Sequence, residues 1–214
     1  MQSTRSLPSP VSFEPNRRAH HRVWLFASVE ALLAFALAMT HIGSRSVWYD
    51  EGVSAIAGTS SWGAIEHQAR TFDPNMSGYH AALHLWQGVF GDSVTALRSL
   101  SAVAFAGAVV MLVALGRRLF DDRTGLLAGL ILAVSPYVVR YGQEMRSYAL
   151  EAFMVTTLTY LFVRVVDADR AAPPAWPAIA YGGTAAFACY VHMYTVFVVA
   201  AHLVSLAFVD PARV

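Results

Sequence analysis

Two adjacent carboxylates, Asp50 and Glu51, follow soon after a long apolar stretch of the chain. The stretch, residues 23–42, carries Glu30 as its only formal charge and is long enough to cross a bilayer, which takes about 20 apolar residues. Charged groups are costly to place at a membrane and are seldom there without a function. The pair is therefore expected at the boundary between water and lipid, where a base would meet a lipid-borne substrate.

A second polar group follows another apolar segment and consists of Arg140, Glu144, Arg146 and Tyr148. A guanidinium can bind a phosphate through two parallel hydrogen bonds, so the arginines suit a lipid-phosphate headgroup, and Glu144 would pair with either of them. For Arg140, anchoring a helix end at the lipid surface is an equally good interpretation. Tyr148 would either hydrogen-bond a substrate or belong to the aromatic belt of the membrane.

Histidines offer a third kind of chemistry. His80 and His84 are four residues apart and would share a helix face, where Asp50 or Glu51 would complete a divalent metal site. The pair lacks the glutamate of a zinc-protease motif, and helix histidines are often only hydrogen-bonded. No metal ligand is assigned, and a divalent ion stays an alternative. Tyr79, His80 and His192 are candidate substrate contacts.

Two charged residues fall inside or at the edge of apolar segments. Glu30 is expected to have a polar partner on another helix. Arg98 would either pair with the acidic residues after the first apolar stretch or anchor its own helix, and we favour the anchor.

The composition is that of a membrane protein. Of 214 residues, 56% are hydrophobic and 14% are charged, against about 25% charged in soluble domains. The formal net charge is +1, the basic residues are scattered, and all of them are arginine. Nucleic-acid binding is not expected. A single cysteine, Cys189, excludes an internal disulfide.

Apolar segments predict an all-α integral membrane protein with about six transmembrane helices. They are residues 23–42, 95–119, 125–139, 148–163, 176–190 and 193–209. A long first outer loop, residues 43–91, would hold an interfacial helix over 53–69 and a second helix over 79–90. Residues 1–22 are expected to be a disordered cytoplasmic tail, residues 23–209 the transmembrane domain, and residues 210–214 a short tail.

The arginines predict the orientation of these segments. If each segment crosses once, one side holds Arg17, Arg18, Arg22, Arg117, Arg118, Arg123, Arg164, Arg170 and Arg213. The other side holds Arg45, Arg70, Arg98, Arg140 and Arg146. By the positive-inside rule the first side is cytoplasmic. The two carboxylates, Arg146 and His192 would then share the outer face.

Several short motifs recur in this order in one known family. They are Trp48-Tyr49-Asp50-Glu51, residues 79–86, residues 96–101, residues 116–120, Ser135-Pro136-Tyr137 and residues 141–150. This pattern resembles the N-terminal portion of family 39-type, GT-C fold membrane glycosyltransferases, relatives of the protein mannosyltransferases. The resemblance covers about residues 23–209.

The resemblance implies a polyprenyl-phosphate sugar as donor, an unknown extracytoplasmic acceptor, and a multi-pass protein of the plasma membrane. It implies Asp50 as the catalytic carboxylate, with Glu51 to orient it, bind acceptor or hold a metal. Arg146 lies in the family-like run and is the better candidate for the donor phosphate. The expected activity is inverting transfer of a mannose-like sugar. The alternatives are a truncated non-catalytic relative and a transporter or flippase of lipid-linked precursors.

Overall fold

A computed structural model describes residues 17–71, 74–167 and 174–208, and within these ranges every regular element is helical. The helices that run along the bundle are α1 (Arg17–Met39), α5 (Val94–Leu119), α6 (Asp122–Val134), α8 (Tyr148–Val166), α9 (Trp176–Val191) and α10 (Thr195–Ser205). The remaining elements are α2 (Tyr49–Thr59), α3 (Trp62–Thr71), α4 (Ser77–Phe90), α7 (Pro136–Gly142) and the 3-10 turn η1 (Leu206–Phe208).

Local sequence explains where several helices begin and end. Ser93 caps α5 by accepting a hydrogen bond from the Ala96 amide, and Asp121 caps α6 by accepting one from Thr124. Arginines 117 and 118 occupy the last turn of α5, where cations are stabilised by the helix dipole. Pro136 cannot continue α6, and the chain bends by 66° into α7.

Three helices are long and apolar enough to cross a bilayer. They are α1 over His21–Met39, α5 and α8, with mean hydropathies of 1.7, 2.2 and 1.5, and the bent pair α6–α7 would add a fourth. The α10–η1 segment, Thr195–Phe208, is apolar but shorter. The all-helical membrane class is confirmed, whereas helix length and composition support three or four crossings and do not confirm six.

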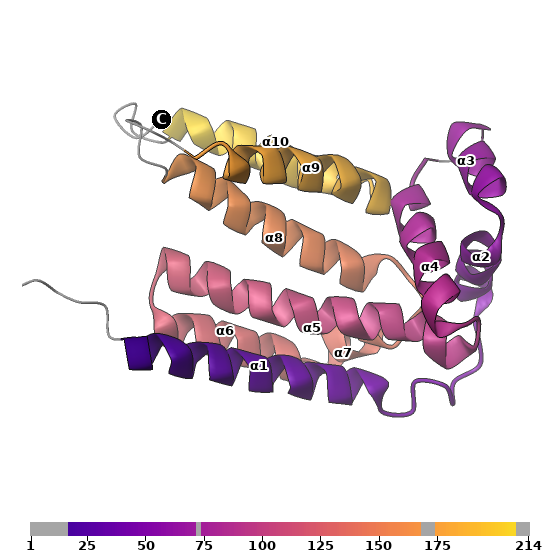
Figure 1. Cartoon of the computed structure of the whole chain (residues 1–214), viewed down its shortest axis with the longest axis horizontal. Helices are drawn as coiled ribbons and strands as arrows, with labels where there is room; N and C mark the ends of the chain where they lie inside the picture. Colours follow the sequence, from indigo (N-terminus) through magenta and orange to yellow (C-terminus); the bar gives the residue numbers. More distant parts are fainter. Residues whose placement is uncertain (1–16, 72–73, 168–173, 209–214) are drawn as a thin grey trace, which may run out of the picture.

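The helices lie side by side and alternate in direction (Figure 1). Helices α2, α3 and α4 gather at one end of this bundle, beside the start of α8 and the turn between α9 and α10. The opposite end holds the start of α1 and the α5–α6 connection. We call these the α2–α4 end and the opposite end.

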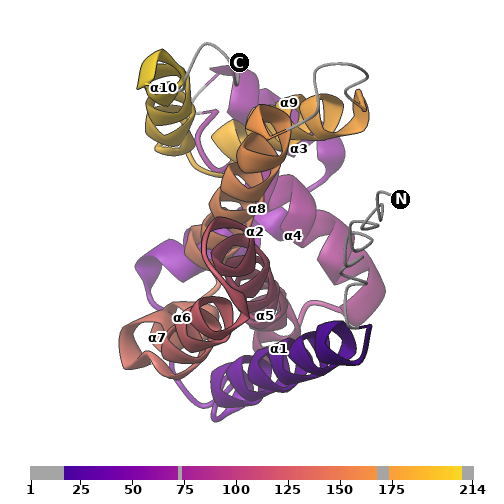
Figure 2. The ribbon, with the colours of Figure 1, turned by 90° about the vertical axis from the view of Figure 1, so that its left-hand side faces the viewer.

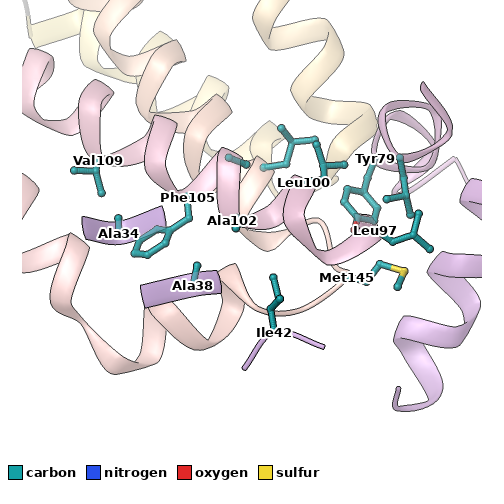
Figure 3. Packing of buried hydrophobic residues seen from close by; sticks show 14 of the residues in the cluster. Ala34, Ala38, Ile42, Tyr79, Leu97, Leu100, Ala102, Phe105, Val109 and Met145 are labelled. Carbon is teal, nitrogen blue, oxygen red and sulfur yellow. The ribbon is translucent and has the colours of Figure 1, made fainter. Parts of the chain in front are cut away.

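Helix α5 forms the centre of the bundle and packs against α1, α6 and α8 (Figure 2). Phe105 of α5 lies against Ala34 and Ala38 of α1 in the largest buried cluster (Figure 3). Small residues let the two backbones approach closely, which is how transmembrane helices associate without a hydrophobic driving force. The cluster continues to Tyr79 and Met145 at the α2–α4 end, so the core directly supports the polar residues there.

Two expectations about charged and terminal residues are corrected. The Oε2 atom of Glu30 is buried without a hydrogen bond to any described residue, and Gly129 of α6 lies next to it in place of a polar side chain. Helix α1 begins at Arg17, so residues 17–22 are helical rather than part of a disordered tail. Residues 1–16 and the expected tail 210–214 lie outside the described residues.

Candidate active site

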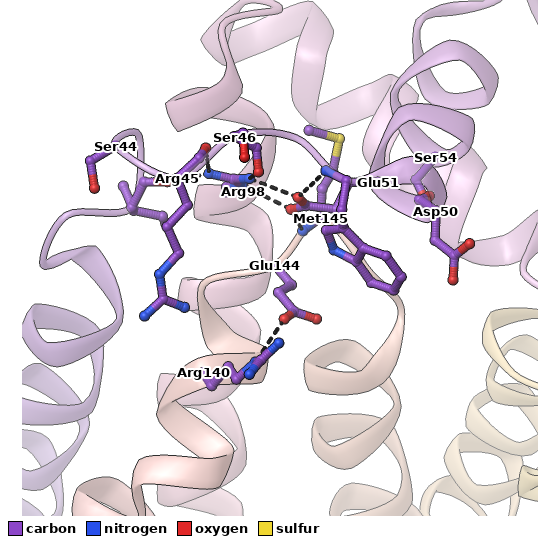
Figure 4. A network of polar contacts seen from close by, with 12 residues as sticks. Ser44, Arg45, Ser46, Asp50, Glu51, Ser54, Arg98, Arg140, Glu144 and Met145 are labelled. Carbon is purple, nitrogen blue, oxygen red and sulfur yellow. Dashed lines mark hydrogen bonds and ion pairs between the residues drawn. The ribbon is translucent and has the colours of Figure 1, made fainter.

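The two adjacent carboxylates occupy the first turn of α2, where the helix dipole favours negative charge. They nevertheless point in different directions: Glu51 turns toward Arg98 of α5, and Asp50 turns away from it (Figure 4). The side chain of Glu51 is 1% exposed, whereas that of Asp50 is 39% exposed. Neighbours in sequence therefore have separate surroundings.

Glu51 forms a fully buried two-pronged ion pair with Arg98. The Arg98 Nε and Nη2 atoms donate to Oε1 and Oε2 at 2.8 and 2.7 Å. The Met145 amide donates to Oε1 as well, at 2.8 Å. Arg98 Nη1 donates to the carbonyls of Ile42 and Arg45 at 2.7 and 3.0 Å. This network joins the end of α1, the start of α2, α5 and the turn before α8.

The surroundings of Glu51 keep its carboxyl group ionised beside the Arg98 guanidinium. Burial alone would raise the pKa of Glu51, but the hydrogen bonds from Arg98 and Met145, and the charge of Arg98, hold that pKa below its ordinary value of 4.5. A buried charge is tolerated only when paired and hydrogen-bonded, and both partners meet this condition. The pairing alternative for Arg98 is what the structure shows.

Asp50 meets a different arginine. Arg146 Nη2 lies 3.6 Å from Asp50 Oδ2, and Nη1 donates to the Asp50 carbonyl at 3.4 Å. The guanidinium lies between two aromatic rings, 5.9 Å from the centre of Trp48 and 5.5 Å from that of Tyr148. Two residues 96 positions apart are thus brought together, and the loose ion pair leaves the Asp50 carboxylate open to a ligand.

Arg140 and Glu144 belong to a separate cavity. They form an ion pair of 3.2 Å, with Arg140 mostly exposed and Glu144 mostly buried. The cavity of about 390 Å³ is lined by Arg45, Ser46, Trp48, Glu51, Arg98, Arg140, Gln143 and Glu144. Asp50 and Arg146 do not line it. Trp48 lines this cavity and also contacts Arg146, so it lies between the two places.

Tyr148 and His192 lie beside Arg146. The ring centres of Tyr148 and His192 are 6.1 Å apart, and His192 Nδ1 is 3.5 Å from Glu151 Oε1. Burial lowers the pKa of His192, and the positive charge of Arg146 lowers it further. The imidazole is therefore neutral at pH 7.

Tyr79 and His80 are enclosed by the protein rather than open to a substrate. Their side chains belong to residues that are 0% and 4% exposed, on the face of α4 that packs into the core. Burial raises the pKa of the Tyr79 phenol. A substrate would reach neither of them without rearrangement, so direct contact is not supported by this geometry.

The metal alternative gains no support from the described part of the chain. There, no three side chains of His, Cys, Asp or Glu come together in an arrangement that would hold a metal ion. His84 Nδ1 instead lies 3.1 Å from the Gly58 carbonyl, and its ring packs edge-on against Trp62. The proposed His80–His84 pair is not assembled with Asp50 or Glu51.

The geometry defines a helical membrane protein with a carboxylate and an arginine facing each other at one end of its bundle. Residues 74–214 match the dolichyl-phosphate-mannose-protein mannosyltransferase family, and the chain belongs to this family. The matched range includes Arg146, Tyr148 and His192 and begins after Asp50 and Glu51. No curated protein and no solved structure matches the chain. Family membership indicates a membrane glycosyltransferase of the GT-C type that uses a lipid-linked sugar.

Three residues of this end were not among the predicted site residues. Arg98 and Glu151 carried a signal, since each is a charge near the start of an apolar segment. Trp48 carried one as well, since it opens the Trp48-Tyr49-Asp50-Glu51 motif. Its position between Arg146 and the Arg140 cavity depends on the path of the chain after α1, which no local pattern specifies.

Proposed function

We propose that the chain supplies the catalytic end of an inverting glycosyltransferase. The enzyme would move a mannose-like sugar from a polyprenyl-phosphate carrier to an extracytoplasmic acceptor. The single observation that supports this most is the meeting of Asp50 with Arg146, a carboxylate half open to solvent beside a guanidinium fixed between two rings. The first can accept a proton, and the second can bind a phosphate.

The proposed reaction is a single displacement. Asp50 takes the proton of the acceptor hydroxyl, whose oxygen forms a bond to the anomeric carbon of the sugar. The bond between that carbon and the phosphate oxygen breaks, and its electron pair leaves with the polyprenyl phosphate. Arg146 stabilises the negative charge that grows on this phosphate. Glu51 and Arg98 hold the first turn of α2 against α5 and touch no substrate, so we assign them positioning roles.

The proposal includes a membrane orientation. Six crossings with the α2–α4 end outside would place Asp50, Arg146 and His192 on the extracytoplasmic face of the plasma membrane. The arginines of the last turn of α5 would then lie at the cytoplasmic face. The helices α9 and α10 would have to cross with help from their flanking residues, since they are shorter than a typical span.

Asp50→Asn tests the proposal. Membranes that contain the full chain are given a radiolabelled polyprenyl-phosphate mannose, and label in the acceptor fraction is measured. Loss of a general base should lower transfer by about 100-fold or more. The matched control is Asp92→Asn, an exposed aspartate just before α5, which should leave transfer unchanged. Transfer by Asp50→Asn at the wild-type rate would refute the role of the base.

A further inference from the structure

Glu151 is a carboxylate that the proposed chemistry does not yet use. It lies in the first turn of α8, inside an apolar span, with its side chain 20% exposed. The helix dipole stabilises a negative charge in this turn, which explains why the residue is tolerated. The helix dipole does not explain the direction of the side chain. The Glu151 carboxylate approaches the ring of His192, the residue that follows the last turn of α9.

The contact between Glu151 and His192 is not a completed ion pair. The Tyr194 amide donates a hydrogen bond to His192 Nδ1 at 3.4 Å, so this nitrogen is an acceptor and the proton of the neutral ring lies on Nε2. Glu151 Oε1 faces the same Nδ1 atom at 3.5 Å. Two acceptors therefore face each other, and the carboxylate keeps its capacity to bind a donor from elsewhere.

This pair is continuous with the Asp50–Arg146 corner. The Tyr148 ring lies under the Arg146 guanidinium on one side and 6.1 Å from the His192 ring on the other. Tyr194 adds a second ring, 4.9 Å from His192 and mostly exposed. A carboxylate acceptor, an Nε2 donor and two aromatic rings thus stand beside the arginine assigned to the donor phosphate.

We infer that Glu151 and His192 bind hydroxyl groups of the donor sugar and thereby select which sugar the site accepts. This rests on the proposed function, because it places the sugar next to the phosphate held by Arg146. Sugar hydroxyls donate hydrogen bonds to the Glu151 carboxylate, and His192 Nε2–H donates to a sugar oxygen. Tyr148 and Tyr194 provide apolar walls, the usual lining of a site with few orienting polar groups.

Binding measured with and without the sugar separates this role from a purely structural one. The full chain in lipid nanodiscs is titrated with polyprenyl-phosphate mannose and with bare polyprenyl phosphate. Wild-type protein should bind the sugar-bearing lipid more tightly. Glu151→Gln should bind the sugar-bearing lipid about 10-fold or more weaker than wild type, as expected for loss of a hydrogen bond to a charged group. Its affinity for the bare lipid should equal that of wild type.

Glu66→Gln is the matched control, an exposed glutamate of α3 paired with Arg70, and should change neither affinity. Glu151→Gln that binds both lipids like wild type, or weakens both equally, overturns the inference. His192→Phe, which keeps a ring, should repeat the sugar-specific loss. A wild-type chain that binds the sugar-bearing lipid more tightly yet transfers no sugar would refute the proposed catalysis and leave the binding role standing.

Discussion

At the residue scale, the neighbouring carboxylates Asp50 and Glu51 differ in burial and hydrogen bonding, and this difference suits them to different roles. Glu51 is enclosed with Arg98 and receives three hydrogen bonds at 2.7–2.8 Å, so its lone pairs are occupied. Asp50 has one loose contact with Arg146 and is partly open. A buried, fully bonded carboxylate is a poor proton acceptor for a substrate, and this is the reason for assigning the chemistry to Asp50.

The lowered pKa of Glu51 predicts an acid-dependent loss of stability. A depressed pKa in the folded state adds stability above the ordinary value of 4.5, and this stability is lost progressively as the pH falls from 4.5 through the lower pKa of the folded state. At pH 7, Glu51→Gln should destabilise the protein by roughly 3 kcal/mol, because Arg98 loses its charge partner.

Thermal unfolding in detergent between pH 7 and pH 4 measures this effect. The gap in melting temperature between wild type and Glu51→Gln should narrow as the pH falls below 4.5. Glu66→Gln, at an exposed position, should show no such gap. A gap that stays constant over this pH range would contradict the buried ion pair.

At the element scale, α5 and the antiparallel α6 pack closely against each other through glycines. A Cβ added to Gly125 would lie 2.6 Å from the Val113 carbonyl oxygen and 2.9 Å from the Arg117 nitrogen, both backbone atoms that cannot give way alone. A Cβ added to Gly116 would likewise lie 2.8 Å from the Cα of Gly125. Such small-residue contacts replace hydrophobic burial as the source of helix association in lipid.

Gly125→Ala should therefore destabilise the protein by about 1–3 kcal/mol, the usual cost of overpacking. Gly182→Ala is the control, since a Cβ there meets nothing within 4 Å and alanine favours a helix. Melting temperatures in detergent compare the two. Equal effects of the two substitutions would show that α5 and α6 do not pack in this way.

At the scale of the whole molecule, the alternation of helix direction predicts which loops share a side of the membrane. Single cysteines introduced into a Cys189→Ala background test this with a membrane-impermeant thiol reagent. Ser44→Cys and Met193→Cys should react from outside in intact cells, because both lie at the α2–α4 end. Arg123→Cys and Ala175→Cys should react only after permeabilisation. Labelling of Ser44→Cys and Met193→Cys from opposite sides would refute six crossings.

Sequence patterns predicted the helices well and their mutual rotation poorly. Each of the six apolar segments contains a helix in the described part of the chain, because hydrophobic runs and caps are local properties. Arg140 was grouped with Arg146, yet Arg140 lines the cavity beside Trp48, whereas Arg146 is not part of that lining and lies against Asp50. His80 was expected to face a substrate, but the packed face of α4 includes it. Which face of a helix is covered depends on its neighbours, and a single sequence does not specify them.

The position of Met145 in the Glu51–Arg98 network has a consequence for the biogenesis of the protein. Its amide completes the set of donors around Glu51 and is contributed 47 residues after Arg98 and 94 after Glu51. During synthesis, the Met145 donor is therefore made after α1, α2, α5 and the whole α6–α7 segment. The corner that orients Asp50 cannot be completed until this part of the chain has been synthesised.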